Sequence, residues 1–129
     1  MEKVYKVVRK LEDGSLRSAV ISDDQILVSY EIGVWAEPRI TGSYLYAFGN
    51  VWDARRFRRQ LLPLDRVVIL ECQAETIPAT PRICSEFFNL DETLRWWLER
   101  AFWGKMSDAA PGGTVWCTKI MPVKEVEDA

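Results

Sequence analysis

The segment from Asp65 to Ala74 contains the run Val67-Val68-Ile69-Leu70, which constrains the fold more than any other sequence feature. Neighbouring residues of a β-strand point to opposite sides, so four consecutive apolar side chains leave neither side polar. The run is also far shorter than the ~18 residues of a membrane-spanning helix. We therefore expect a central β-strand that is covered on both faces.

Other segments typical of β-strands lie before and after this run. They are rich in β-branched and aromatic residues, and the turn Glu12-Asp13-Gly14 joins the first two as a hairpin. The expected strands are Val4 to Leu11, Leu16 to Ser22, Ile26 to Ile32, Ser43 to Phe48, Asp65 to Ala74 and Thr114 to Met121. The expected loops are Ser22 to Asp24, Trp35 to Gly42, Thr76 to Pro81 and Ser107 to Gly113.

Two segments carry the start and stop signals of helices. Asn50 is a suitable N-cap for a helix from Val51 to about Leu62, which Pro63 ends. A second helix is expected from Asp91 to Trp103, with Asn89 as its N-cap and Gly104 at its C-terminal turn.

These elements predict a single domain over residues 1–129. The expected fold class is α+β, with a mostly antiparallel sheet of about six strands and two helices packed on one side. The 129 residues are enough for one hydrophobic core. A composition of 48% hydrophobic and 28% charged residues excludes a disordered or fibrous chain.

The second helix carries two tryptophans outside its apolar stripe. At about 100° per residue, Trp96 and Trp103 share one line on the side opposite the stripe, beside Glu99 and Arg100. Large indole rings there need a cover. The leading hypothesis is therefore a binding or interaction protein that forms a homo-oligomer. Trp96 and Trp103 would lie in the interface or in a pocket between subunits, with Arg100 and Glu99 as the polar rim.

The chain contains no histidine, which removes the usual general base and the usual metal ligand. The sequence also lacks glycine-rich phosphate loops, the nucleophile elbow and the calcium-binding loop. We therefore assign no catalytic residue and predict no cofactor and no metal. A non-enzymatic role is favoured, although carboxylates, tyrosine or lysine can also perform acid–base chemistry.

The alternative function is a histidine-free enzyme that acts on a small molecule. Glu71 would be its acid–base group if the carboxyl were buried, assisted by a tyrosine and by an arginine of the first helix. Tyr44 and Tyr46 share one face of their strand. Together with Glu71 they form a possible ligand pocket, which could hold a cation or an amphipathic ring if the tyrosines face a cavity rather than the core.

Four arginines of the first helix are candidate anion-binding residues: Arg55, Arg56, Arg58 and Arg59. A basic helix with aromatic neighbours can follow the phosphates of nucleic acid, which is the third and weakest hypothesis. The formal net charge of the chain is −2, so the protein as a whole does not attract nucleic acid. The sequence favours a solvated face, which could still bind a phosphorylated small molecule or an acidic partner.

Three cysteines, Cys72, Cys84 and Cys117, are widely spaced and form no CxxC pair. The first expected strand begins almost at Met1, without the pattern of a signal peptide, and no apolar run is long enough to span a membrane. The sequence therefore predicts a cytoplasmic protein with free thiols and no membrane partner.

The stretch Gly42-Ser43-Tyr44-Leu45-Tyr46-Ala47-Phe48, followed by Asp53-Ala54-Arg55-Arg56-Phe57, resembles a pattern in small uncharacterised proteins of phage and mobile gene cassettes. In those proteins a short aromatic strand leads directly into a helix of the form xDAxxF. The resemblance covers about a fifth of the chain. It implies a compact protein of prokaryotic mobile DNA, and it implies no activity and no residue role.

Replacement of both outward tryptophans tests the interface hypothesis. A homo-oligomer of the wild type should dissociate in the double variant Trp96→Ala, Trp103→Ala, because a tryptophan at the centre of an interface contributes about 2 kcal/mol or more. Sedimentation equilibrium measures the mass directly. A wild-type protein that is already monomeric, with an unchanged mass in the variant, would rule out the oligomer.

Overall fold

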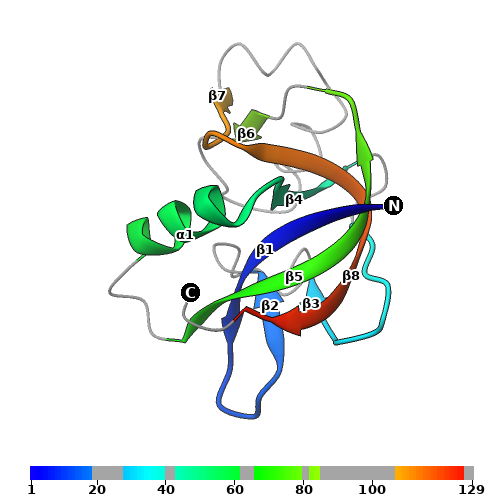
Figure 1. Ribbon diagram of the computed structural model, residues 1–129, viewed down its shortest axis with the longest axis vertical. Coiled ribbons are helices and arrows are strands. Elements are labelled where there is room, and N and C mark those ends of the chain that lie inside the picture. Colours follow the sequence, from blue (N-terminus) through cyan, green and yellow to red (C-terminus); the bar gives the residue numbers. More distant parts are fainter. Residues whose placement is uncertain (19–27, 40–42, 62–65, 80–81, 85–106, 127–129) are drawn as a thin grey trace.

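The structure is a computed structural model that describes residues 1–18, 28–39, 43–61, 66–79, 82–84 and 107–126. This part of the chain is mostly antiparallel β-structure with one helix (Figure 1). Its elements are β1 (Glu2–Lys10), β2 (Leu16–Ser18), β3 (Ser29–Tyr30), β4 (Leu45–Phe48), α1 (Val51–Gln60), β5 (Val67–Ile77), β6 (Arg82–Cys84), β7 (Ser107–Ala109) and β8 (Thr114–Glu125).

The main sheet closes on itself. Its strand order is β3-β2-β1-β4-β8-β5, and β5 also pairs with β1, so that β1, β4, β8 and β5 form a small closed barrel. The closing pair is long and antiparallel, running from Glu2 opposite Ala74 to Arg9 opposite Val67. The β5–β8 register shifts at two places, between Glu71 and Cys72 and between Glu75 and Thr76. Such irregularities bend a strand and increase its twist, which helps a short sheet to curve into a barrel.

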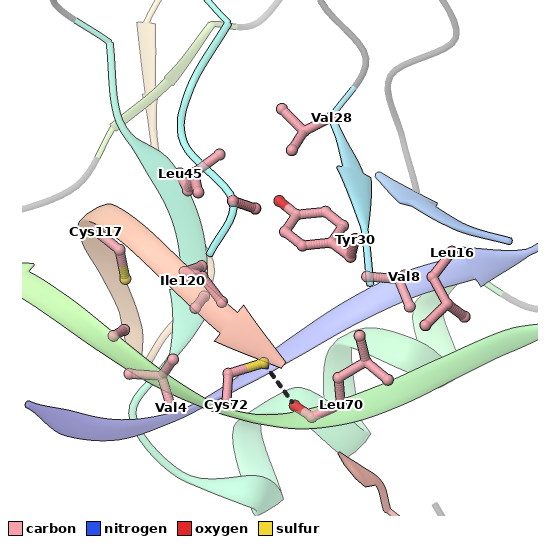
Figure 2. Close-up of a cluster of buried hydrophobic side chains, with 13 residues drawn as sticks. Val4, Val8, Leu16, Val28, Tyr30, Leu45, Leu70, Cys72, Cys117 and Ile120 are labelled. Atoms are coloured by element: carbon pink, nitrogen blue, oxygen red, sulfur yellow. Dashed lines mark hydrogen bonds between the residues drawn. The ribbon is translucent and has the colours of Figure 1, made fainter. Parts of the chain in front are cut away.

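Alternation along β5 creates two separate cores. Leu70, Cys72 and Ala74 point into the barrel, where Figure 2 shows Leu70 and Cys72 among the other interior side chains. Val67 and Ile69 point to the outer face and belong to a second core beside α1. Ile69 and Leu70 are both 0% exposed. The prediction that the run Val67-Val68-Ile69-Leu70 is covered on both faces is therefore confirmed.

Helix α1 packs on the outside of the barrel, where it contacts β1, β4 and β5. The side-chain oxygen of Asn50 accepts a hydrogen bond from the Asp53 amide at 2.9 Å, which confirms the predicted N-cap. Ala54 is fully buried, and the Phe57 ring lies 5.3 Å from that of Phe48 on β4. These contacts fix the helix against the second core.

Several predicted boundaries were wrong. Strand β8 continues through Pro122 to Glu125, beyond the predicted end at Met121, because the proline lies opposite Cys72 at a register shift where its missing N–H is tolerated. Strand β5 continues to Ile77, into the predicted loop. Part of the expected loop from Ser107 to Gly113 is strand β7, which pairs with β6 in a separate two-stranded sheet.

The predicted second helix and its tryptophans lie outside the described residues. The predicted strands at Leu16 to Ser22 and Ile26 to Ile32 lie there in part, and their described portions include β2 and β3. Closure of the sheet was not predicted, because periodicity shows which side chains share a face but not which strands pair.

The turn before β8 requires a glycine at position 113, because of its backbone conformation and because a neighbouring side chain lies close to it. Gly113 has a φ of +83°, and a Cβ at this position would collide with the Asp53 side chain. We expect Gly113→Ala to lower the free energy of unfolding by roughly 1–3 kcal/mol in urea denaturation. Gly112→Ala is the matched control, because a Cβ there meets nothing within 4 Å. Equal stability of the two variants would contradict this account.

Candidate functional site

A pocket of about 480 Å³ lies between α1 and the outer face of the barrel. It is lined by Tyr5, Val51, Arg55, Glu71, Lys124, Glu125 and Val126. The strand register assembles it, since Tyr5 of β1 lies opposite Glu71 of β5, and Glu71 lies opposite Lys124 of β8. Three residues that are distant in the sequence therefore form one row across three strands.

The two carboxylates of this pocket already have lysine partners. Glu71 lies 3.7 Å from the Lys3 ammonium and keeps 20% of its side chain exposed. Glu125 lies 3.3 Å from the Lys10 ammonium. Within the described residues, the two cations of the pocket, Arg55 and Lys124, form no ion pair. The lining therefore carries positive charge that the protein has not neutralised locally.

Arg55 is the most constrained of these side chains. Its guanidinium carbon lies 5.1 Å from the centre of the Trp52 ring, a cation–π contact that holds the arginine at the pocket. The Nε atom of Arg55 is buried and has no hydrogen-bond partner in the described part of the chain. Trp52 itself is 69% exposed. A buried guanidinium N–H without an acceptor is unfavourable unless a ligand or water supplies one.

The other three arginines of α1 point to different surroundings. Arg56 is exposed and lies 3.6 Å from Asp53. The Nε atom of Arg58 donates a hydrogen bond to the Val67 carbonyl at 2.7 Å, which ties the helix to β5. Arg59 is exposed. Of these four arginines, only Arg55 lines the pocket.

The structure separates the tyrosines that the sequence grouped with Glu71. Tyr44 stacks on Trp116 with ring centres 5.2 Å apart, and Tyr46 meets the same ring edge-on at 6.2 Å. Trp116 is buried. It is Tyr5 that lies beside Glu71, and this residue was not singled out from the sequence because its partner strand was unknown.

The residues proposed for the interface lie outside the described part of the chain: Trp96, Glu99, Arg100 and Trp103. The side chain of Cys84 also lies outside it. Within the described ranges, no group of three or more histidine, cysteine, aspartate and glutamate side chains could hold a metal ion. No helix in those ranges is both long and apolar enough to cross a membrane.

A lysine that sequence reasoning missed lies on the inner face of β1. Lys6 occupies the strand between the buried Val4 and Val8, and its ammonium donates a hydrogen bond to the Tyr46 carbonyl at 2.6 Å. The ammonium also lies 5.7 Å from the centre of the Tyr30 ring. Desolvation by burial lowers the pKa of Lys6 to about 8. The spacing Val4, Lys6, Val8 was the available signal, since all three share one strand face.

The two thiols nearest to this lysine are poor nucleophiles. Burial raises the pKa of Cys72 and of Cys117 to about 12, which keeps both sulfurs protonated at neutral pH. The Cys72 thiol points to the Leu70 carbonyl, with Sγ and oxygen 3.5 Å apart (Figure 2). These thiols behave as small core residues rather than as nucleophiles.

No protein-family model matches this sequence, and comparisons with curated proteins and with solved structures gave no match.

Lys6 makes the stability depend on pH. Its pKa falls from 10.5 in the unfolded chain to about 8 in the fold, so the unfolded chain binds more protons between these values. The free energy of unfolding of the wild type, relative to Lys6→Met, should therefore rise by roughly 3 kcal/mol as the pH increases from below 8 to above 10.5.

Urea denaturation of both proteins at a series of pH values measures this difference. The raised pKa values of Cys72 and Cys117 lower the stability of both proteins above pH 9, and subtraction largely removes that contribution. A difference that stays constant with pH would contradict the burial of the ammonium.

Proposed function

We propose that this protein is a binding protein for a small anionic molecule, held in the pocket between α1 and the barrel. The observation that carries the proposal is the buried Arg55 Nε, which has no hydrogen-bond acceptor in the described part of the chain. A carboxylate or phosphate oxygen would supply this acceptor and pair with the guanidinium charge. Lys124 in the same lining would add a second positive charge.

The charge balance of the pocket supports an anion rather than a cation. Glu71 and Glu125, the carboxylates in the lining, are paired with Lys3 and Lys10. Val51, the first residue of α1, also lines the pocket, which places the positive end of the helix dipole beside the ligand. The cations of the pocket therefore remain available to a bound anion.

The remaining lining favours a ligand with an apolar or aromatic body. Tyr5, Val51 and Val126 supply an aromatic ring and two aliphatic side chains. The volume of about 480 Å³ is within the range of pockets that hold small molecules. An aromatic carboxylate or an aryl phosphate would satisfy both parts of the lining.

Catalysis is the second candidate. The pocket brings together a carboxylate, a tyrosine and an arginine of the first helix, namely Glu71, Tyr5 and Arg55. Glu71 is half-buried and lies close to Lys3, however, whereas a buried carboxylate without a partner is the arrangement that would favour acid–base chemistry. Binding is therefore the better supported function.

The proposal also includes a cytoplasmic location and self-association. Cys72 and Cys117 are free thiols, as is usual in a reducing compartment. Self-association through Trp96 and Trp103, like an origin in mobile DNA, rests on the sequence alone.

Arg55→Gln tests the binding site, with phenyl phosphate as the probe. We expect shifts of backbone amide signals in ¹H–¹⁵N NMR spectra of the wild type to cluster at the pocket. The variant should bind at least tenfold more weakly, because a charge-assisted hydrogen bond contributes about 1.5–3 kcal/mol. Benzyl alcohol, the neutral probe, should bind both proteins equally weakly.

Arg56→Gln is the matched control, since Arg56 is the next residue of α1 but pairs with Asp53 and does not line the pocket. It should bind phenyl phosphate as the wild type does. Equal weakening in both variants, or amide shifts spread over the surface, would contradict the proposal.

A further inference from the structure

The charged residues of the pocket beside α1 differ in their exposure to solvent. Lys124 and Glu125 are exposed. Arg55 and Glu71 are half-buried, and Glu71 keeps 20% of its side chain exposed. The less exposed part of the lining therefore holds one positive and one negative side chain.

These two half-buried side chains do not neutralise each other. In the described part of the chain, Arg55 and Glu71 form no ion pair with each other, although both line the pocket. The buried Nε atom of Arg55 has no acceptor there. The Glu71 carboxylate lies 3.7 Å from the Lys3 ammonium, which is longer than a hydrogen bond, so it accepts none from this lysine. A donor and an acceptor are therefore both available to a ligand.

An aromatic ring lies beside the negative group. Tyr5 of β1 and Glu71 of β5 are opposite residues in the strand register, and both line the pocket. The face of a tyrosine ring attracts a cation, and a carboxylate next to the ring supplies the opposite charge. This combination favours an ammonium group on the sheet side of the pocket. On the helix side, Arg55 favours a carboxylate.

We propose that the ligand of this pocket is a free α-amino acid with an aromatic side chain. Its carboxylate pairs with Arg55, and its ammonium group donates hydrogen bonds to Glu71 beside the Tyr5 ring. Val51 and Val126 line the same pocket and provide apolar contacts for the side chain. This inference rests on the proposed function, because the carboxylate occupies the anion position beside α1.

The half-buried carboxylate also discriminates against phosphate esters. A phosphate monoester carries about two negative charges at neutral pH and has no ammonium group to donate to Glu71. The charge of Glu71 then opposes binding, because like charges repel in a partly desolvated pocket. Phenyl phosphate therefore reports the anion position alone, whereas an amino acid satisfies both charged side chains.

A comparison of phenylalanine with 3-phenylpropanoate tests the proposal, since the two compounds differ only in the amino group. NMR titration of the full chain at pH 7 measures both affinities. We expect phenylalanine to bind the wild type about tenfold more tightly, because its ammonium group adds a charge-assisted hydrogen bond. In Glu71→Gln, phenylalanine should bind about tenfold more weakly than in the wild type. The affinity of 3-phenylpropanoate should not fall in this variant, because the lost charge repels its carboxylate.

Glu75→Gln is the matched control. Glu75 lies on the same strand but does not line the pocket, and glutamine keeps an acceptor for the Thr118 hydroxyl. This variant should bind both compounds as the wild type does. Equal weakening of phenylalanine in Glu71→Gln and Glu75→Gln would overturn the proposal, because the effect would then not arise in the pocket.

Failure of this inference differs from failure of the proposed function. If 3-phenylpropanoate binds, Arg55→Gln weakens it and phenylalanine binds no more tightly, the amino-acid ligand is overturned and the anion site stands. If neither compound causes amide shifts at the pocket, the amino-acid ligand is overturned and the anion site loses its support as well.

Discussion

The pairing of β1 with β5 is the constraint on which the rest of the structure depends. It joins the two strands over eight residue pairs and closes the sheet, so that both strands have an inner face toward the barrel core and an outer face that is partly covered beside α1. A shift of this register by one residue would exchange the two faces. Lys6 would then leave the interior and Tyr5 would leave the pocket. One set of backbone hydrogen bonds therefore fixes both the lining of the candidate pocket and the inward position of Lys6.

The distribution of charge follows from the same closure. Lys3 and Lys10 lie on the surface and pair with Glu71 and Glu125. The Lys6 ammonium lies instead in desolvated surroundings near Tyr30 on the inner side of the barrel, and Arg55 lies on the outer side beside the exposed Trp52, with its Nε atom buried. A folded protein gains little stability from cations placed in this way. The placement of Arg55 is accounted for by the proposed anion in the pocket beside α1.

The sequence predicted correctly those features that depend on residues close together in the chain. The run Val67-Val68-Ile69-Leu70 predicted a strand covered on both faces, and Asn50 predicted the start of α1. The predicted end of the last strand at Met121 was wrong, because the register shift that accommodates Pro122 depends on the partner strand. The strand pair β6–β7 was missed for a similar reason, since short segments separated by more than twenty residues carry no periodicity of their own.

The candidate site was harder to predict than the fold. Glu71 and an arginine of α1 were recognised as candidates, but their meeting with Tyr5 and Lys124 requires the register of three strands. Tyr44 and Tyr46 were grouped with Glu71 on residue type alone, and the structure places them around Trp116 instead. The inward position of Lys6 could have been predicted from the sequence, because Lys6 shares one strand face with Val4 and Val8. Its desolvation, however, follows from barrel closure, which a single sequence does not encode in any short pattern.

The most direct test of this account is whether β1 and β5 pair in solution as described. Nuclear Overhauser effects between backbone protons of the opposite residues Val4 and Cys72, and of Lys6 and Leu70, report this pairing. The account predicts cross-strand contacts at both pairs. Contacts that place Tyr5 rather than Lys6 opposite Leu70, or no contacts between β1 and β5, would contradict it.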